Sequence, residues 1–200
     1  MLQKKDIVVF DFDGTLSAGD CSMEFGKYCF RRSPRMWMSL PMLGVALVAR
    51  WMNPSGLWWR EKMRRGISAD MISRMAPGFI KQHRQERFGW AKEQVAAEKN
   101  AGRKVVLISA GPDYLVPELV RDIKFDAVIC SRMNKRCPWK YDFLCWGPNK
   151  VIALDEWAVK NKYIPRVVRS YSDSKSDQPM MDISAEEVWV DRKTGLRKHA

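Results

Sequence analysis

The sequence lacks the features of a secreted or disulfide-stabilised protein. Its five cysteines form no C-x-x-C pair, and an odd number of cysteines without a secretory leader is typical of reduced thiols in the cytosol. The apolar run near the N-terminus ends at Asp11 after only a few residues, which is too short for the apolar segment of a signal peptide. We therefore expect a cytoplasmic protein whose cysteines are small buried side chains.

Motifs of nucleic-acid-binding proteins are also missing, because nothing in the chain resembles an RNP motif, a zinc finger or a recognition helix. No internal repeat or low-complexity tract stands out. The charge nevertheless favours an anionic partner, since 35 Lys and Arg against 23 Asp and Glu give a net charge of +12. Nucleic acid, a phosphorylated metabolite and an acidic membrane face all fit that charge, and the missing motifs count against the first.

What the chain does have is an alternation of short apolar runs with helical patterns. Its 200 residues, 46% of them hydrophobic, suffice for one buried core with or without a smaller insert. This order predicts an α/β fold with a Rossmann-like doubly wound parallel sheet and right-handed crossovers. Strands are expected at residues 7–12, 105–108, 127–129, 166–171 and 187–190, helices at 112–120 and 148–159, a hairpin within 132–146, and a mobile basic tail at 192–198.

The spacing of the first two strands predicts a second domain. Residues 13–104 separate them, far more than one crossover helix requires. We therefore assign residues 20–98 to a helical cap inserted after the first strand, and residues 1–19 and 99–200 to the α/β core. Ligands in such a core bind beyond the carboxyl ends of the strands, where a cap covers them.

Two carboxylates lie at the end of the first predicted strand, directly behind the apolar run of residues 7–10, in the segment Asp11-Phe12-Asp13-Gly14-Thr15. Alternate residues of an extended segment point the same way, so Asp11 and Asp13 can converge on one space. Gly14 allows a sharp turn and a close approach of the backbone to a ligand. Two like charges this close need a divalent cation, and carboxylate oxygens suit Mg²⁺. Alone, the segment fits a solvated Asp-Gly turn equally well. Catalytic partners elsewhere in the sequence would favour the metal site over the turn.

Candidate partners lie at the ends of other predicted elements. Lys150, near a helix start, offers a fixed positive charge to a phosphoryl group. Asp173 and Asp177 follow the strand at 166–171 and can complete a magnesium site. Ser109 ends the second strand, where its hydroxyl can hold phosphate oxygens together with two backbone N–H groups, those of Ala110 and Gly111. Each residue alone fits a turn, a surface charge or a helix face, but together they favour a phosphoryl-transfer site.

These segments resemble the four motifs of the haloacid dehalogenase superfamily, and the insert is similar in place and length to the cap of its phosphoserine phosphatase-like branch, subclass IB. The resemblance implies that Asp11 is the nucleophile that forms an aspartyl phosphate, and that Asp13 protonates the leaving oxygen and activates water. It implies that Mg²⁺ is bound by Asp11, the Asp13 carbonyl and Asp173, with Asp177 in support. It also implies a phosphate-binding set of Thr15, Ser109, Ala110, Gly111 and Lys150. The family usually has glycine where this chain has Ser172, and we expect the small hydroxyl to be tolerated.

Substrate choice is expected to lie in the cap. Residues 36–49 carry no charge, and their length is short of a membrane span but fits a buried or an interfacial helix. Basic residues flank this run, with Trp37, Trp51, Trp58 and Trp59 in or near it, as at a lipid headgroup boundary. The whole pattern, including Gly147-Pro148-Asn149-Lys150-Val151, resembles bacterial phosphatidylglycerophosphatase C. That resemblance implies phosphatidylglycerophosphate as substrate and peripheral contact with the inner face of the cell membrane. A helix that packs only inside the cap explains the same run.

Two other functions stay open. One is a phosphatase of a small soluble phosphomonoester such as phosphoserine. A resemblance to phosphoserine phosphatase implies an acid nine residues after the nucleophile and an arginine in the cap. In this chain Asp20 is the acid at that position, and the candidates for the cap arginine are Arg60, Arg64 and Arg65. Asp20 also fits a cap hinge or a helix N-cap. A non-enzymatic nucleic-acid-binding protein is the remote alternative, and no nucleic acid is expected because the basic residues gather in the cap and not along a groove.

Overall fold

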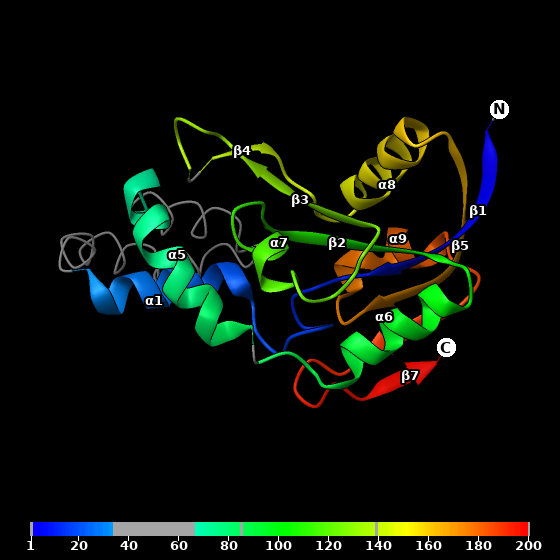
Figure 1. Ribbon diagram of the computed structural model, residues 1–200, viewed down its shortest axis with the longest axis horizontal. Helices are drawn as coiled ribbons and strands as arrows, with labels where there is room; N and C mark the ends of the chain where they lie inside the picture. Colours follow the sequence, from blue (N-terminus) through cyan, green and yellow to red (C-terminus); the bar gives the residue numbers. More distant parts are fainter. Residues whose placement is uncertain (1, 34–66, 85, 139, 200) are drawn as a thin grey trace.

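The described part of the chain, residues 2–33, 67–84, 86–138 and 140–199 of a computed structural model, forms one seven-stranded sheet (Figure 1). Its strand order is β4-β3-β2-β1-β5-β6-β7, and neighbouring strands are parallel except in the edge pairs β3–β4 and β6–β7. This confirms the predicted α/β fold with a mostly parallel sheet. The strands are β1 (Gln3–Phe10), β2 (Lys104–Pro112), β3 (Ala127–Met133), β4 (Tyr141–Phe143), β5 (Tyr163–Ser172), β6 (Glu187–Val190) and β7 (Arg197–His199).

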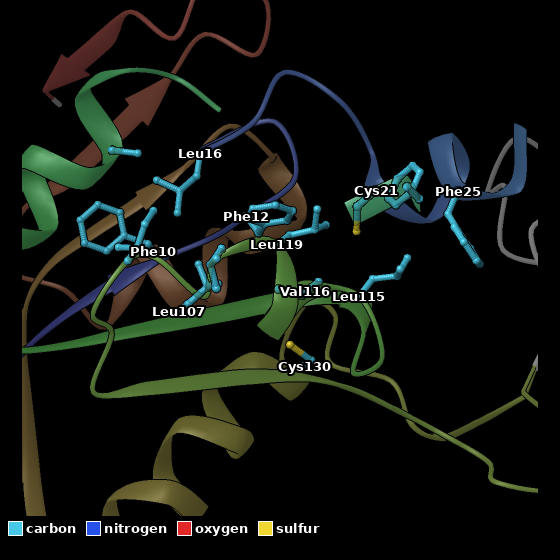
Figure 2. Close-up of a cluster of buried hydrophobic side chains, with 14 of the residues drawn as sticks. Phe10, Phe12, Leu16, Cys21, Phe25, Leu107, Leu115, Val116, Leu119 and Cys130 are labelled. Carbon is cyan, nitrogen blue, oxygen red and sulfur yellow. The ribbon is translucent and has the colours of Figure 1, made fainter. Parts of the chain in front are cut away.

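Helices cover both faces of the sheet, which explains why β1 and β2 have unbroken apolar runs. Val8 and Phe10 of β1 lie in a core shared with α6 and α7, whereas Ile7 and Val9 lie in a second core shared with α8 and α9. Figure 2 shows part of the first core. The helices are α1 (Cys21–Arg32), α5 (Ala69–His83), α6 (Trp90–Asn100), α7 (Val116–Leu119), α8 (Asn149–Lys160) and α9 (Gln178–Asp182), with a 3-10 turn, η1 (Lys175–Asp177).

The ends of β1 and β5 are held together by more than their ladder. The rings of Phe10 and Tyr171 stack with centroids 4.2 Å apart, a contact worth roughly 1 kcal/mol beyond the area that it buries. The N–H of Asp11 then donates to the carbonyl of Tyr171 at 3.0 Å. As a result, the residues that follow β1 and those that follow β5 leave the sheet side by side.

Two local predictions are wrong. The helix expected at 112–120 is shorter, because β2 continues through Pro112, where the Asp113 N–H donates to the Ser131 carbonyl at 3.0 Å, and α7 starts only at Val116. The tail expected to be mobile instead forms β7, which pairs with β6, and Asp191 closes the turn between them by accepting hydrogen bonds from two backbone N–H groups. An edge strand can carry exposed charged side chains, so the basic residues of the tail do not distinguish a strand from an unpaired segment.

The stretch assigned to the cap contains elements of two kinds. Helices α1 and α5 pack together through aromatic rings, with centroids 5.2 Å apart for Phe25 and Phe79, and they lie at the carboxyl end of the parallel strands (Figure 1). Helix α6 instead lies along the sheet beside β2 (Figure 1), and its Ala91 and Val95 belong to the first core. Residues 36–49 and all three candidate cap arginines lie outside the described residues. Within the described residues, no helix is long and apolar enough to cross a membrane.

A buried carboxylate ties α6 to the sheet. Glu98 is 2% exposed and makes ion pairs with Arg103 and Arg169 and a hydrogen bond with Gln94. We expect Glu98→Gln to lower the free energy of unfolding by about 1–3 kcal/mol, less than for a fully buried pair because both arginines are partly exposed. Urea unfolding measures this, with Glu93→Gln, an exposed change on the same helix, as the control. Equal midpoints for the two variants would contradict a stabilising role for Glu98.

Candidate active site

Three of the predicted site residues follow the carboxyl ends of two neighbouring strands, and a fourth lies at the start of helix α8. Asp11 follows β1, and Asp173 follows β5. Asp177 closes η1, directly after that loop, and Lys150 is the second residue of α8. Because β1 and β5 are adjacent in the sheet, these four side chains reach one space.

Lys150 lies at the centre of this site. Its Nζ is 2.6 Å from Asp11 Oδ1 and 2.7 Å from Asp177 Oδ2, and all three side chains are buried. Burial alone would lower the pKa of Lys150, but the two carboxylates outweigh it and raise that pKa. Burial raises the pKa of Asp11 to about 6, although the ammonium of Lys150 opposes the shift. Lys150 therefore places a fixed positive charge against the carboxylate predicted to be the nucleophile.

Thr15 joins the second pair of carboxylates. Its Oγ1 lies 3.0 Å from Asp11 Oδ2 and 3.3 Å from Asp173 Oδ1, so both acids face the same hydroxyl. Burial raises the pKa of Asp173, even though Arg192 opposes this with an ion pair at 2.9 Å. Two carboxylates held this close in a buried site repel each other, and a cation between them would stabilise the charged forms of both.

The donors at this site fit Mg²⁺. Asp11 and Asp173 offer carboxylate oxygens, and the backbone carbonyl of Asp13 is a further oxygen of the kind that Mg²⁺ prefers. No cluster of three or more His, Cys, Asp or Glu side chains able to hold a metal occurs in the described part of the chain. Asp177 is engaged instead by Lys150 and by the Ser172 hydroxyl at 2.7 Å. Asp177 therefore holds Lys150 in position and is not itself one of the candidate metal ligands.

Asp13 is held by the first residue of α1. Its carboxylate accepts a hydrogen bond from the Cys21 N–H at 2.7 Å and one from the Cys21 thiol at 3.4 Å. Burial, followed by the nearby charge of Asp20, raises the pKa of Asp13 to about 7. Asp20 caps α1 by accepting from the Met23 N–H at 3.0 Å, which confirms the predicted N-cap. The predicted proton donor is thus fixed by the helix that opens the cap.

Residues Ser109, Ala110 and Gly111 lie in an irregular part of β2, next to Cys21. The N–H of Gly111 donates to Ser109 Oγ at 2.9 Å, so this N–H is turned towards the hydroxyl. A Cβ on Gly111 would lie 2.6 Å from a methyl carbon of Val116 and 2.9 Å from the Cys21 sulfur, so only glycine fits between them. Through this contact, the end of β2 is packed next to Cys21, the residue that holds Asp13.

Comparison with known proteins identifies the family. The family model described as haloacid dehalogenase-like hydrolase matches residues 8–182, a range that contains every residue of the site except Arg192. The chain belongs to this family. It is a haloacid dehalogenase-like hydrolase, and the resemblance to the superfamily drawn from its motifs is confirmed.

This hydrolase is similar to other known proteins in sequence or in fold. A protein of Mycobacterium tuberculosis named as a probable phosphatase is 31% identical over 116 residues, which cover 56% of this chain and 40% of that protein. Among solved structures, a protein of unknown function from Bordetella pertussis superposes with a TM-score of 0.72 at 14% identity, covering 94% of this chain and 91% of the other. A phospho-aspartyl intermediate analogue of phosphoserine phosphatase gives 0.66 at 17% identity, covering 94% and 87%.

Sequence reasoning gave no role in the site to three side chains that the structure places there. The first is Cys21, one of five free cysteines of which four are buried as expected. The second is Ser172, whose buried hydroxyl donates to Asp177 and accepts from the Ser174 N–H at 3.1 Å, which explains how serine fits where the family usually has glycine. The third is Arg192, in the segment read as a mobile tail. Its only signal in the sequence is that it follows a predicted strand, as Asp173 does.

Proposed function

We propose that this hydrolase is a phosphomonoesterase that uses Asp11 as its nucleophile. The observation that carries the proposal is the buried position of Asp11 at the end of β1, with Lys150 on one oxygen and Thr15 on the other. A buried carboxylate beside a fixed ammonium ion is suited to a dianionic phosphoryl group, because the positive charge offsets the charge that the substrate brings. The resemblance of the motifs to phosphotransferases points to the same chemistry.

In the proposed first step, an oxygen of Asp11 attacks phosphorus, the P–O bond to the alcohol breaks, and an aspartyl phosphate forms. Asp13 gives its proton to the departing oxygen, so that the product leaves as a neutral alcohol. In the second step Asp13 takes a proton from water, and the hydroxide attacks phosphorus and frees Asp11 with release of phosphate. Lys150 neutralises the charge of the transferring group. Mg²⁺ bound by Asp11, Asp173 and the Asp13 carbonyl would supply further charge neutralisation.

For the substrate we propose phosphatidylglycerophosphate at an anionic membrane surface. Support comes from the net charge of +12 and from the turn that joins β3 to β4. That turn exposes Lys135, Arg136 and Lys140, and within the described residues none of the three has an ion-pair partner. The β3–β4 hairpin and the α1–α5 pair lie at the same end of the sheet (Figure 1), so these cations border the side from which substrate reaches Asp11. Such a cluster attracts anionic headgroups.

The second candidate substrate is a small soluble phosphomonoester such as phosphoserine. One observation favours it specifically, because Asp20 is near enough to Asp13 to raise the pKa of that carboxyl. An acid beside the proton donor can bind a cationic group on the leaving alcohol. The structural likeness to phosphoserine phosphatase shows that the two proteins share a fold.

The two candidates predict different effects of the hairpin cations. We expect the triple variant Lys135→Ala, Arg136→Ala, Lys140→Ala to lower kcat/KM for phosphatidylglycerophosphate in anionic vesicles by about 10- to 100-fold, because each cation near such a surface contributes about 1 kcal/mol. Hydrolysis of phosphoserine should change little. The control removes three exposed lysines from the opposite end of the sheet, Lys4, Lys160 and Lys162. Equal loss in the two triple variants, or no hydrolysis of the lipid by the wild type, would contradict the lipid proposal.

A further inference from the structure

We propose that Arg192 is a positioning residue that sets the orientation of the Asp173 carboxylate for metal binding. The inference rests on the proposed function, in which Asp173 is a ligand of Mg²⁺. Arg192 Nε lies 2.9 Å from Asp173 Oδ2. Asp173 is almost fully buried, whereas the arginine is 55% exposed, so the ion pair reaches into the site from its rim.

The backbone that carries Arg192 is firmly built. Asp191 accepts three hydrogen bonds on one oxygen, from the N–H groups of Lys193 and Thr194 and from the Thr194 hydroxyl, at 2.8–3.0 Å. The pairing of β6 with β7 closes the same turn from its other side. The turn thus limits the positions that the guanidinium group of Arg192 can take. A group held in this way can orient another side chain.

The Asp173–Arg192 pair also lies directly over Gly14. A Cβ on Gly14 would overlap the Asp173 carboxylate and would lie 2.7 Å from Arg192 Nε. Gly14 has a φ of +85°, which other residues rarely adopt. The glycine therefore lets the nucleophile loop pass beneath this ion pair, and the pair is packed against the loop that carries Asp11 and Asp13.

The two oxygens of Asp173 have separate partners. Arg192 holds Oδ2, while Oδ1 faces the Thr15 hydroxyl, which also faces Asp11. By fixing one oxygen, Arg192 keeps the other directed at the space between the two acids. Hydrogen bonds to the outer atoms of metal ligands typically contribute 10- to 100-fold to metal affinity because they pre-orient the ligand. Because more than half of the Arg192 side chain is exposed, water weakens its repulsion of a cation, and we expect the orienting effect to be the larger one.

The test is the affinity for Mg²⁺, measured by isothermal titration calorimetry on the intact chain without substrate. We expect Arg192→Ala to raise the dissociation constant of Mg²⁺ by about 10-fold or more. Arg192→Lys, which keeps the charge but not the planar donor group, should give a smaller increase. The control is Lys193→Ala, which removes an exposed charge from the same turn and should leave the dissociation constant unchanged. Thermal unfolding in EDTA shows whether each variant is folded.

An unchanged or lower dissociation constant in Arg192→Ala would overturn the inference, as would an increase of the same size in Lys193→Ala. A purely structural role would lower the unfolding temperature in EDTA and leave the affinity for Mg²⁺ intact, which also overturns it. If the wild type hydrolyses phosphomonoesters and binds Mg²⁺ while Arg192→Ala binds it equally well, only this inference fails. If the wild type neither binds Mg²⁺ nor hydrolyses phosphomonoesters, the proposed function fails with it.

Discussion

Asp11→Asn is expected to lower kcat by about 10⁴-fold or more, the scale of loss seen when a covalent nucleophile is removed. The amide has nearly the shape of the carboxylate but is a very poor nucleophile towards phosphorus. It can still accept a hydrogen bond from Lys150 at its oxygen. The variant should therefore keep the fold of the wild type, and steady-state kinetics with a chromogenic phosphate ester measures the loss.

A matched control lies on the same strand. Asp6→Asn makes the same chemical change in β1, where Asp6 forms a largely exposed ion pair with Arg166, and exposed pairs contribute little to stability. We expect Asp6→Asn to retain wild-type activity. Turnover by Asp11→Asn close to that of Asp6→Asn would show that another residue attacks phosphorus.

Lys150→Met is expected to have the largest effect on stability. The side chains are similar in length, but the variant leaves Asp11 and Asp177 buried without their shared cation. Loss of one partner from a buried ion pair typically costs about 3–5 kcal/mol in the free energy of unfolding, because the remaining charge is uncompensated. Activity should also fall by at least about 100-fold, since the positive charge facing the phosphoryl group is lost.

The control for this variant is Lys160→Met, an exposed position in the last turn of the same helix. Urea unfolding in EDTA compares the two without any contribution from bound metal. We expect Lys160→Met to unfold at nearly the same urea concentration as the wild type. If Lys150→Met matched it in stability and activity, Lys150 would not be the central cation of the site.

Much of the core could be predicted from the sequence, because its signals are local. The strands β1 and β2 are buried on both faces and therefore have unbroken apolar runs. The predicted acids and Lys150 each follow a strand or open a helix, and parallel strands bring such residues to one edge of the sheet. A helix start was also readable, since Asp20 has the short acceptor side chain that caps α1.

Other features depend on contacts between distant segments, which the sequence does not display. Arg192 follows β6 and Asp173 follows β5, and the two side chains meet only because these strands are neighbours in the sheet. Helix α6 falls within the stretch assigned to the cap, yet it lies along the sheet beside β2 (Figure 1), which its place in the chain does not reveal. The sequence indicates which side chains favour burial, but it does not indicate which element they will pack against.

The central claim is that Asp11 becomes covalently phosphorylated, and one measurement tests it directly. Wild-type enzyme is mixed with substrate, quenched in acid within one turnover, digested and analysed by tandem mass spectrometry. We predict one phosphoryl group on the peptide that contains Asp11, located at that residue, and none in Asp11→Asn. Turnover that leaves Asp11 unmodified, or a phosphoryl group on a different side chain, would contradict the account.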